Sequence, residues 1–221
     1  MPTPRRAAGR HRRHARTLGA VTAIQELLHP DGNALSDQTL SGSAPGVLIT
    51  EADLQDCHFE AVNLEGATLK SSALEDCDFH ECNLANAQLV GTVFTRCRFV
   101  DCKLVGADWS RAGLSLLPPV TITFERCILD YASLSRVNFS RARFIDCSMR
   151  DTDFTDANLS KATLGNCELT GARFHGTDLR QADLRGSRGY FFDPRDNQTR
   201  GLKLSALEAP GLLAAFGIRV D

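Results

Sequence analysis

The sequence predicts an all-β solenoid, in which short extended segments wind into stacked coils. Every fifth residue from Leu54 to Leu184 is Leu, Phe, Trp or Met at 26 of 27 positions, and Pro119 is the exception. The residue two positions earlier is mostly small or short, as at Ala52 and Cys57. Residues two apart point to the same side of an extended chain, so each unit turns two side chains inward and three outward. A helix repeats every ~3.6 residues and a regular strand alternates, so neither fits this period.

Several units carry the motif A-(D/N)-L-x-x. The segments Ala52–Leu54, Ala157–Leu159 and Ala182–Leu184 match it fully, and Cys77–Phe79 is a variant. The chain therefore resembles the pentapeptide-repeat family over the repeat region 51–186. The resemblance implies a right-handed quadrilateral β-helix of about seven coils, with roughly 20 residues per coil. One unit cannot bury its own apolar pair, so the stacking of coils must supply the core.

The repeat predicts columns of like residues in the interior. The rings of Phe59, Phe79, Phe99 and Phe139 are expected to stack along one wall, with Pro119 between them. All eight cysteines occupy the small inward position. Their C-x4-C spacing differs from the C-x2-C typical of zinc sites, so we expect free thiols that pack as small apolar residues in a reducing compartment. Three cysteine columns are expected: 57/77/97, 82/102 and 127/147/167.

Composition indicates one principal domain without a membrane span. The chain has 221 residues, 43% of them hydrophobic, and a formal net charge of −2. Neither an apolar run long enough to cross a membrane nor the apolar region of a signal peptide is found in the sequence. We therefore expect a cytoplasmic protein.

The segment before the repeat divides into two parts. Residues 1–30 begin with a basic arm of six arginines between Arg5 and Arg16, followed by a possible short helix over Leu18–Leu28. The arm is open to four interpretations: a disordered tail, a start codon assigned too far upstream, an organelle presequence, or a contact with nucleic acid or anionic lipid. Residues 31–50 are expected to form an irregular first coil that covers the open end, with the loop Ser41–Gly46 resetting the phase.

The segment 113–121 interrupts the motif but keeps its phase. Because Trp109 and Phe124 remain a multiple of five apart, we expect no insertion, one degenerate unit and a bulge or kink at Pro118–Pro119.

The segment 187–221 is expected to close the rod. Tyr190–Asn197 predicts a strand entering a turn, and Gly201–Leu204 its return. Ser205 and Glu208 have the spacing of a capping box, which predicts a helix that ends at Gly217. This helix either caps the last coil or forms a homodimer contact, and the two roles are compatible. The residues proposed for the cap or dimer are Leu212, Leu213, Phe216 and Ile218.

No catalytic, cofactor-binding or metal-binding motif is present in the sequence. His58, His80 and His175 fall on outward positions without an evident catalytic partner. We therefore expect a non-enzymatic protein that takes no cofactor and no small-molecule substrate.

Outward charge is the remaining guide to function. Residues 51–90 carry nine acidic residues against Lys70, a net charge of −8, whereas residues 91–150 carry a net charge of +4 and residues 151–186 of −2. The acidic residues form the predicted partner-binding surface: Glu51, Asp53, Asp56, Glu60, Glu65, Glu75, Asp76, Asp78 and Glu81.

Two functions are consistent with these features. The first is a protein-binding scaffold in the cytoplasm. The second follows from a weaker resemblance to Qnr-type fluoroquinolone-resistance proteins, which extends to the Gly217–Val220 tail. That resemblance implies a DNA mimic that pairs through its C-terminal helix, occupies the DNA groove of gyrase or topoisomerase IV, and protects the enzyme from quinolones or related toxins. Mimicry requires negative charge along the rod, and the sequence supplies it on the first coils.

Overall fold

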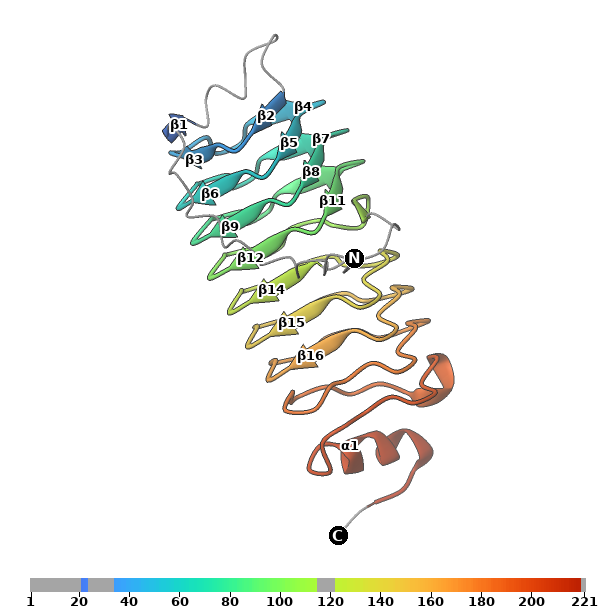
Figure 1. Ribbon diagram of the computed structural model, residues 1–221. Helices are drawn as coiled ribbons and strands as arrows, with labels where there is room; N and C mark the ends of the chain where they lie inside the picture. Colours follow the sequence, from blue (N-terminus) through green and yellow to red (C-terminus); the bar gives the residue numbers. More distant parts are fainter. Residues whose placement is uncertain (1–20, 24–33, 115–121, 220–221) are drawn as a thin grey trace, which may run out of the picture.

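The computed structural model describes residues 21–23, 34–114 and 122–219 of the chain. These residues form a rod of stacked coils with parallel strands in columns along its length and a short helix at the C-terminal end (Figure 1). The predicted quadrilateral β-helix with a C-terminal helix is therefore confirmed. No helix among the described residues is long and apolar enough to cross a membrane.

Three of the four sides of the rod contain strands, and all strand pairs are parallel. Face A holds β1 (Val21–Ala23), β3 (Thr39–Ser41), β6 (His58–Glu60), β9 (Asp78–His80), β12 (Arg98–Val100), β14 (Thr123–Glu125), β15 (Arg143–Ile145) and β16 (Thr163–Gly165). Face B holds β2 (Ala34–Ser36), β5 (Asp53–Gln55), β8 (Ala73–Glu75), β11 (Val93–Thr95) and β13 (Gly113–Leu114). Face D holds β4 (Leu48–Thr50), β7 (Thr68–Lys70) and β10 (Gln88–Val90).

Single β-bridges complete the remaining side and extend the others. Face C is a bridge column that begins at Ser43 and runs through Asn83 and Ile128 to Arg188. Face B continues as the column Asn138, Asn158, Asp178 and Gln198. The four columns explain the period of five, because each unit forms one side and then turns a corner.

The corners require an unusual backbone conformation. The residue that follows each side has a positive φ even where it is not glycine, as at Asp56 (52°) and Arg126 (52°). Such a conformation is costly for a side chain with a Cβ and persists only where the surroundings hold it. Here the corner N–H bonds to a carbonyl of the next coil, as from Asp56 to Glu75 at 2.9 Å.

The interior follows the predicted pattern, with one change of register. The middle residue is buried in strands β3 to β12 and β14 to β16, and Leu35 in β2 is partly buried. Phe59, Phe79 and Phe99 stack with centroids 4.1 and 4.5 Å apart. Phe99 then pairs with Phe124 across 25 residues, rather than with residue 119. The expectation that nothing is inserted near Pro119 is therefore wrong: five extra residues lie between β13 and β14. The predicted bulge at Pro118–Pro119 itself lies outside the described residues.

This shift of register also rearranges the predicted columns. The stack on face A continues through Phe124 and Phe144, whereas Phe139 belongs to face B and meets the Phe144 ring edge-on at 5.7 Å. The Cys127 thiol donates to the carbonyl of Phe99 and forms a hydrogen bond with Cys102 of the preceding coil. Cys127 therefore continues the column of Cys102, and the cysteines form two columns rather than three. The columns are Cys57, Cys77 and Cys97, and Cys82, Cys102, Cys127, Cys147 and Cys167.

The N-terminal residues depart from the predicted helix. Val21–Ala23 form strand β1, which pairs with β3, so the helix expected over Leu18–Leu28 is wrong at these three residues. The basic arm lies outside the described residues. In the next coil Leu35 pairs with Leu54 at a spacing of 19 residues, and Ser43 bridges Asn63 at a spacing of 20.

The ladder continues beyond Gly186, where the sequence pattern ends. Asp178 bridges Gln198 and Asp183 bridges Lys203, so the last coil lacks the motif but keeps the hydrogen bonds. The strand expected to begin at Tyr190 does not form, and the expected turn is the 3-10 helix η2, Pro194–Asp196. The backbone groups of the last coil are paired because the carbonyl and amide positions repeat even where the side chains do not.

A short helical cap closes the C-terminal end. Helix α1 spans Ala209–Leu213 and continues into the 3-10 helix η3, Ala214–Phe216, which ends at Gly217 with a φ of 71°, the predicted end of the helix. The predicted capping box is absent. The Ser205 Oγ accepts from the N–H of Gly186, and the Glu208 carboxylate accepts from the N–H of Gly189. Both side chains thus fasten the cap to the last coil.

Candidate functional site

The interior supplies packing rather than reactive groups. All eight cysteines are free and buried. Hydrogen bonds to Cys127 and Cys167, together with burial, raise the pKa of the Cys147 thiol. Hydrogen bonds in the same column lower the pKa of the Cys127 and Cys167 thiols, so it is the burial of all eight thiols, and not their pKa, that keeps them from an outside substrate or metal ion. No group of three or more His, Cys, Asp or Glu side chains with metal-binding geometry occurs in the described part of the chain.

The outward histidines lie next to carboxylates on adjacent coils. The Nδ1 of His58 lies 3.4 Å from Asp78, and the Nδ1 of His80 lies 3.4 Å from Glu60. His175 lies 3.9 Å from Asp196. The sequence indicated no partner for these histidines, because residues 20 or more apart become neighbours only when coils stack. These are surface ion pairs between coils, which contribute little stability.

The nine predicted acidic residues surround the N-terminal coils. Asp53 and Glu75 lie on face B, Glu60 and Asp78 lie on face A, and Glu65 follows the bridge residue Asn63 on face C. The other four occupy corners with positive φ: Glu51, Asp56, Asp76 and Glu81. The structure therefore brings these residues to one end of the rod but distributes them around all of its sides.

Part of this negative charge is neutralised locally. Arg96 donates to both Glu75 and Asp76, and its Nε lies 2.7 Å from Asp76. The hydrogen bond from Arg96 lowers the pKa of the Asp76 carboxyl. Glu65 accepts from the Asn83 amide at 3.1 Å.

Four exposed acidic residues have neither an ion pair nor a side-chain hydrogen bond to any described residue. We call this surface the acidic end, and it consists of Glu51, Asp53, Asp56 and Glu81. Leu48, three residues before Glu51, is 59% exposed. The acidic end therefore combines uncompensated negative charge with an apolar side chain, a combination that charge counting along the sequence did not reveal.

The comparisons with known proteins agree with this fold. The family model described as a pentapeptide repeat region matches residues 50–117 and 120–188, more than half of the chain. The chain belongs to the pentapeptide-repeat family. The gap between the two matched segments falls within the region of the five-residue insertion.

Solved structures of other pentapeptide-repeat proteins resemble this one. A trypsin-treated variant of QnrB1, a plasmid-mediated fluoroquinolone resistance protein, has 22% identity and a TM-score of 0.50, covering 85% of this chain and 90% of that chain. HetL, involved in heterocyst differentiation regulation in the cyanobacterium Nostoc sp., has 18% identity and a TM-score of 0.26, covering 77% and 86%. At these identities the likeness shows the fold alone. The comparison with curated proteins gave no match.

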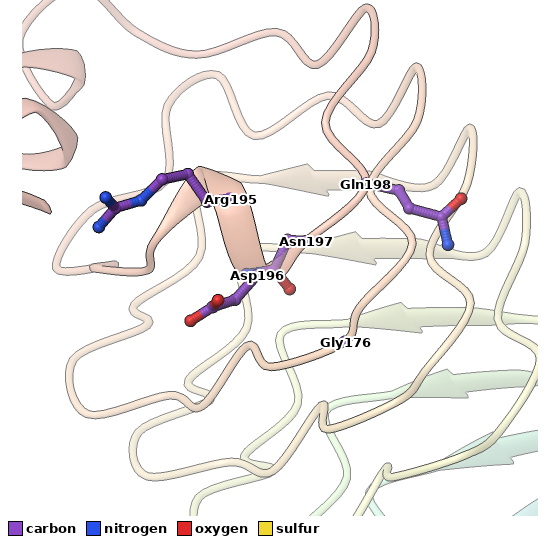
Figure 2. Close-up of a pocket in the computed structure, with 5 residues that line it drawn as sticks. All are labelled: Gly176, Arg195, Asp196, Asn197 and Gln198. Carbon is purple, nitrogen blue, oxygen red and sulfur yellow. The ribbon is translucent and has the colours of Figure 1, made fainter. Parts of the chain in front are cut away.

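A shallow depression near the end of this pentapeptide-repeat rod does not form a convergent binding site. Gly176, Arg195, Asn197 and Gln198 line it with Asp196, and Figure 2 shows the Arg195 and Gln198 side chains pointing in opposite directions. The Asn197 amide is occupied by the carbonyls of Phe174 and Asp193. Ligand sites need polar groups that converge, and these groups serve the backbone instead.

The helical cap exposes apolar surface at the end of the rod. Leu212 is buried against the core, whereas Leu213, Phe216 and Ile218 are 37%, 47% and 50% exposed. The Arg195 guanidinium lies 5.2 Å from the centre of the Phe216 ring and donates to the carbonyl of Ala215. Arg195 thus fixes the exposed ring, a role that the sequence did not suggest.

Proposed function

We propose that the protein is a non-enzymatic scaffold of the cytoplasm that binds a protein partner through the acidic end. The observation that carries this proposal is the exposure of Leu48 on face D, together with the unpaired carboxylates of Glu51 at the next corner and of Asp53 on face B. Protein interfaces combine a desolvated apolar anchor with a polar rim, and complementary charge steers the encounter. The partner is therefore expected to present a basic patch around an apolar pocket. No cofactor or small-molecule substrate belongs to this function.

The test is site-specific crosslinking. A photo-crosslinking amino acid replaces Leu48, and as a control it replaces Gln181, which is exposed on a corner far along the rod. We expect one protein to be captured at position 48 and not at 181, and to bind the purified scaffold directly. Charge reversal by Asp53→Lys with Asp56→Lys should weaken that binding at least tenfold. Equal capture at both positions contradicts the proposal. An affinity for the captured protein that the charge reversal leaves unchanged also contradicts it.

The second candidate is a DNA mimic that binds gyrase or topoisomerase IV. The net charge of −8 over residues 51–90 favours it. The arrangement of charge along face B favours the first function, because Asp56 and Asp76 on one corner are followed by Arg96, Arg141 and Lys161 on the same corner of later coils. A DNA groove neutralises phosphates along its whole length and would repel these later coils.

A supercoiling assay distinguishes the two functions. The purified protein is titrated into gyrase with and without ciprofloxacin. Inhibition of supercoiling or protection from the drug at micromolar protein supports the mimic. The scaffold function predicts neither effect, unless gyrase itself is the protein captured at position 48.

A further inference from the structure

One side of the rod carries cations that no described carboxylate neutralises. It covers face B, the two edges of that face and the start of β15 on face A, in the coils that follow the five-residue insertion. Arg136 stands at the edge shared with face D, Arg141 and Lys161 stand at the edge shared with face A, and Arg143 begins strand β15. All four are exposed, and none forms an ion pair with a described residue. We call these residues, with Arg111 one coil before Arg136, the basic face.

Several other arginines of the rod have carboxylate partners. The corner residues Arg96 and Arg126 pair with Asp76 and Asp101 of the preceding coil, whereas Arg180 and Arg185 pair within their own turn. Arg180 lies 2.6 Å from Asp178, and Arg185 lies 2.6 Å from Asp183. In these last two pairs the carboxylate stands two residues before the arginine, on the outer surface. The cations at the corners of the basic face cannot pair in this way, because the residue two positions earlier points inward. Those inward residues are Leu134 before Arg136, Phe139 before Arg141, and Leu159 before Lys161.

The backbone holds the corner cations in fixed positions. Arg136, Arg141 and Lys161 have φ values of 63°, 65° and 61°. Their N–H groups bond to carbonyls of the next coil at 2.9, 2.9 and 2.8 Å. Successive coils are about 4.8 Å apart, so Arg141 and Lys161 form a close row along one edge.

The floor between the two edges offers hydrogen-bond donors. Asn138 and Asn158 stack on adjacent coils. The Oδ1 of each accepts from a backbone N–H, that of Ser140 at 3.2 Å and that of Ser160 at 3.0 Å. The Nδ2 donors of both amides have no acceptor among the described residues. The floor therefore presents amide donors and serine hydroxyls between rows of cations.

The same surface lacks what a protein or a single strand requires. No exposed large apolar side chain lies on face B between Asn138 and Lys161. Protein interfaces depend on buried aromatic and apolar anchors, and single-strand binding depends on aromatic rings that stack on bases. Asp156 stands on the same edge as Arg136, one coil later and level with Lys161, so the surface includes this one carboxylate, and Asp178, one coil after Asn158, ends the surface toward the C-terminus.

We propose that the basic face binds the sugar-phosphate backbone of double-stranded nucleic acid without reading its sequence. Phosphate contacts in such complexes come from Arg and Lys and from Ser and Asn side chains, the residue types of this surface. Each neutralised phosphate releases counterions, so the affinity falls as salt rises. The proposal is independent of the acidic end and of the partner that binds there.

The experiment measures binding of the full chain to a fluorescein-labelled 20-base-pair DNA duplex of arbitrary sequence by anisotropy, over a series of salt concentrations. The test variant combines Arg136→Gln, Arg141→Gln and Lys161→Gln. The matched control combines Lys70→Gln, Lys103→Gln and Arg150→Gln, which removes the same charge from exposed residues that have no described ion pair. Both variants keep the N-terminal arginines, so any contribution of the basic arm is the same in each.

We expect the test variant to bind at least roughly tenfold more weakly than wild type, with a salt slope smaller by about 2.7, which is ~0.9 for each of three lost contacts. The control should lie within about twofold of wild type. A charge-conserving variant, Arg136→Lys with Arg141→Lys, should retain most of the affinity. Circular dichroism verifies that each variant is folded.

Four results would overturn the proposal. Wild type does not bind the duplex at 50 mM salt, the concentration of the series at which electrostatic binding is strongest. Test and control variants weaken equally, which assigns binding to overall charge. A single strand of the same length binds more tightly than the duplex. Polyglutamate binds, its affinity is weakened by the test variant and not by the control, and DNA does not bind. This result would assign the surface to an acidic protein.

Discussion

The rings of Phe99 and Phe124 stack with centroids 5.0 Å apart and planes 13° apart, although the two residues are 25 positions apart in the chain. The neighbouring pairs Phe79–Phe99 and Phe124–Phe144 are each 20 positions apart and stack in the same way. The continuous stack shows that the five extra residues leave the core column unchanged. One more or one fewer inward unit within the coil would have moved every later side chain to a different face.

Deleting five residues should therefore be tolerated only at the insertion. Removal of residues 116–120 is expected to leave the fold intact and to change the melting temperature by only a few degrees, since surface insertions cost little. Removal of residues 148–152 from a regular coil leaves that coil one side short and should unfold or strongly destabilise the protein. Thermal denaturation followed by circular dichroism compares the two. Equal destabilisation by both deletions would show that the segment 115–121 is part of the packed coil.

Truncation of a stacked ring should reveal how much the column contributes. Phe99→Ala is expected to lower the free energy of unfolding by about 3–5 kcal/mol, because Phe99 is fully buried between Phe79 and Phe124. Gln88→Ala, on the outer surface of β10, should change it by less than about 0.5 kcal/mol. Urea denaturation measures both values. Wild-type stability of the Phe99 variant would refute the inward assignment.

Acid should remove the stabilisation that Asp178 provides. Its side chain is 11% exposed, and the hydrogen bond from Arg180 lowers its pKa below the model-compound value of 3.8. A lowered carboxyl pKa stabilises the fold fully above the unfolded-state pKa, and this stabilisation is lost as the pH falls through the folded-state pKa. Asp178→Asn should thus be most destabilising near pH 7 and progressively less so below about pH 4.

The measurement is urea denaturation of wild type and Asp178→Asn at neutral pH and at several values below 4. Arg180→Gln serves as the paired control, because it removes the cause of the pKa shift and should reduce the same pH dependence. A destabilisation by Asp178→Asn that is equal at every pH would mean that the carboxylate charge is irrelevant there.

The helical cap predicts a homodimer. Leu213, Phe216 and Ile218 expose apolar surface on an element held to the last coil, and such a surface favours a symmetric contact with a second copy. Light scattering with size-exclusion chromatography should give a dimer mass for wild type and a monomer mass for Phe216→Asp. Leu48→Asp, at the opposite end of the rod, should remain dimeric. A monomeric wild type would limit the cap to closing the last coil.

The repeat made most of the architecture predictable. A strict period of five with two inward positions leaves few alternatives, so the inward residues from Leu54 to Leu104 and from Phe124 to Leu184 were all assigned correctly. The boundaries were less predictable. The last coil kept its backbone bridges to Lys203 without the motif, and β1 replaced part of an expected helix, because backbone pairing with an existing ladder does not require a particular side-chain pattern.

The candidate surfaces depended on information that the sequence does not carry. Charge counts located the acidic coils, but only the structure separated Asp76, paired with Arg96, from Asp56, which has no described partner. Four of the five cations of the basic face were likewise hidden in a net charge of +4 over residues 91–150, and Lys161 was hidden in a net charge of −2 over residues 151–186. Its cations come together because corner positions of successive coils are neighbours in space.

The sequence by itself determined that the chain forms a solenoid, which residues fill its interior, and that its chemistry lies on the surface, whereas the four-sided cross-section was implied by the family resemblance. A local pattern suffices for the solenoid and its interior, since each unit repeats the same inward and outward choice. Only the tertiary structure showed which strands pair on the two sides of the five-residue insertion. It pairs β12 with β14, and Phe99 therefore stacks on Phe124. An insertion of one whole unit preserves the phase of the pattern, so its effect appears only when the coils are paired.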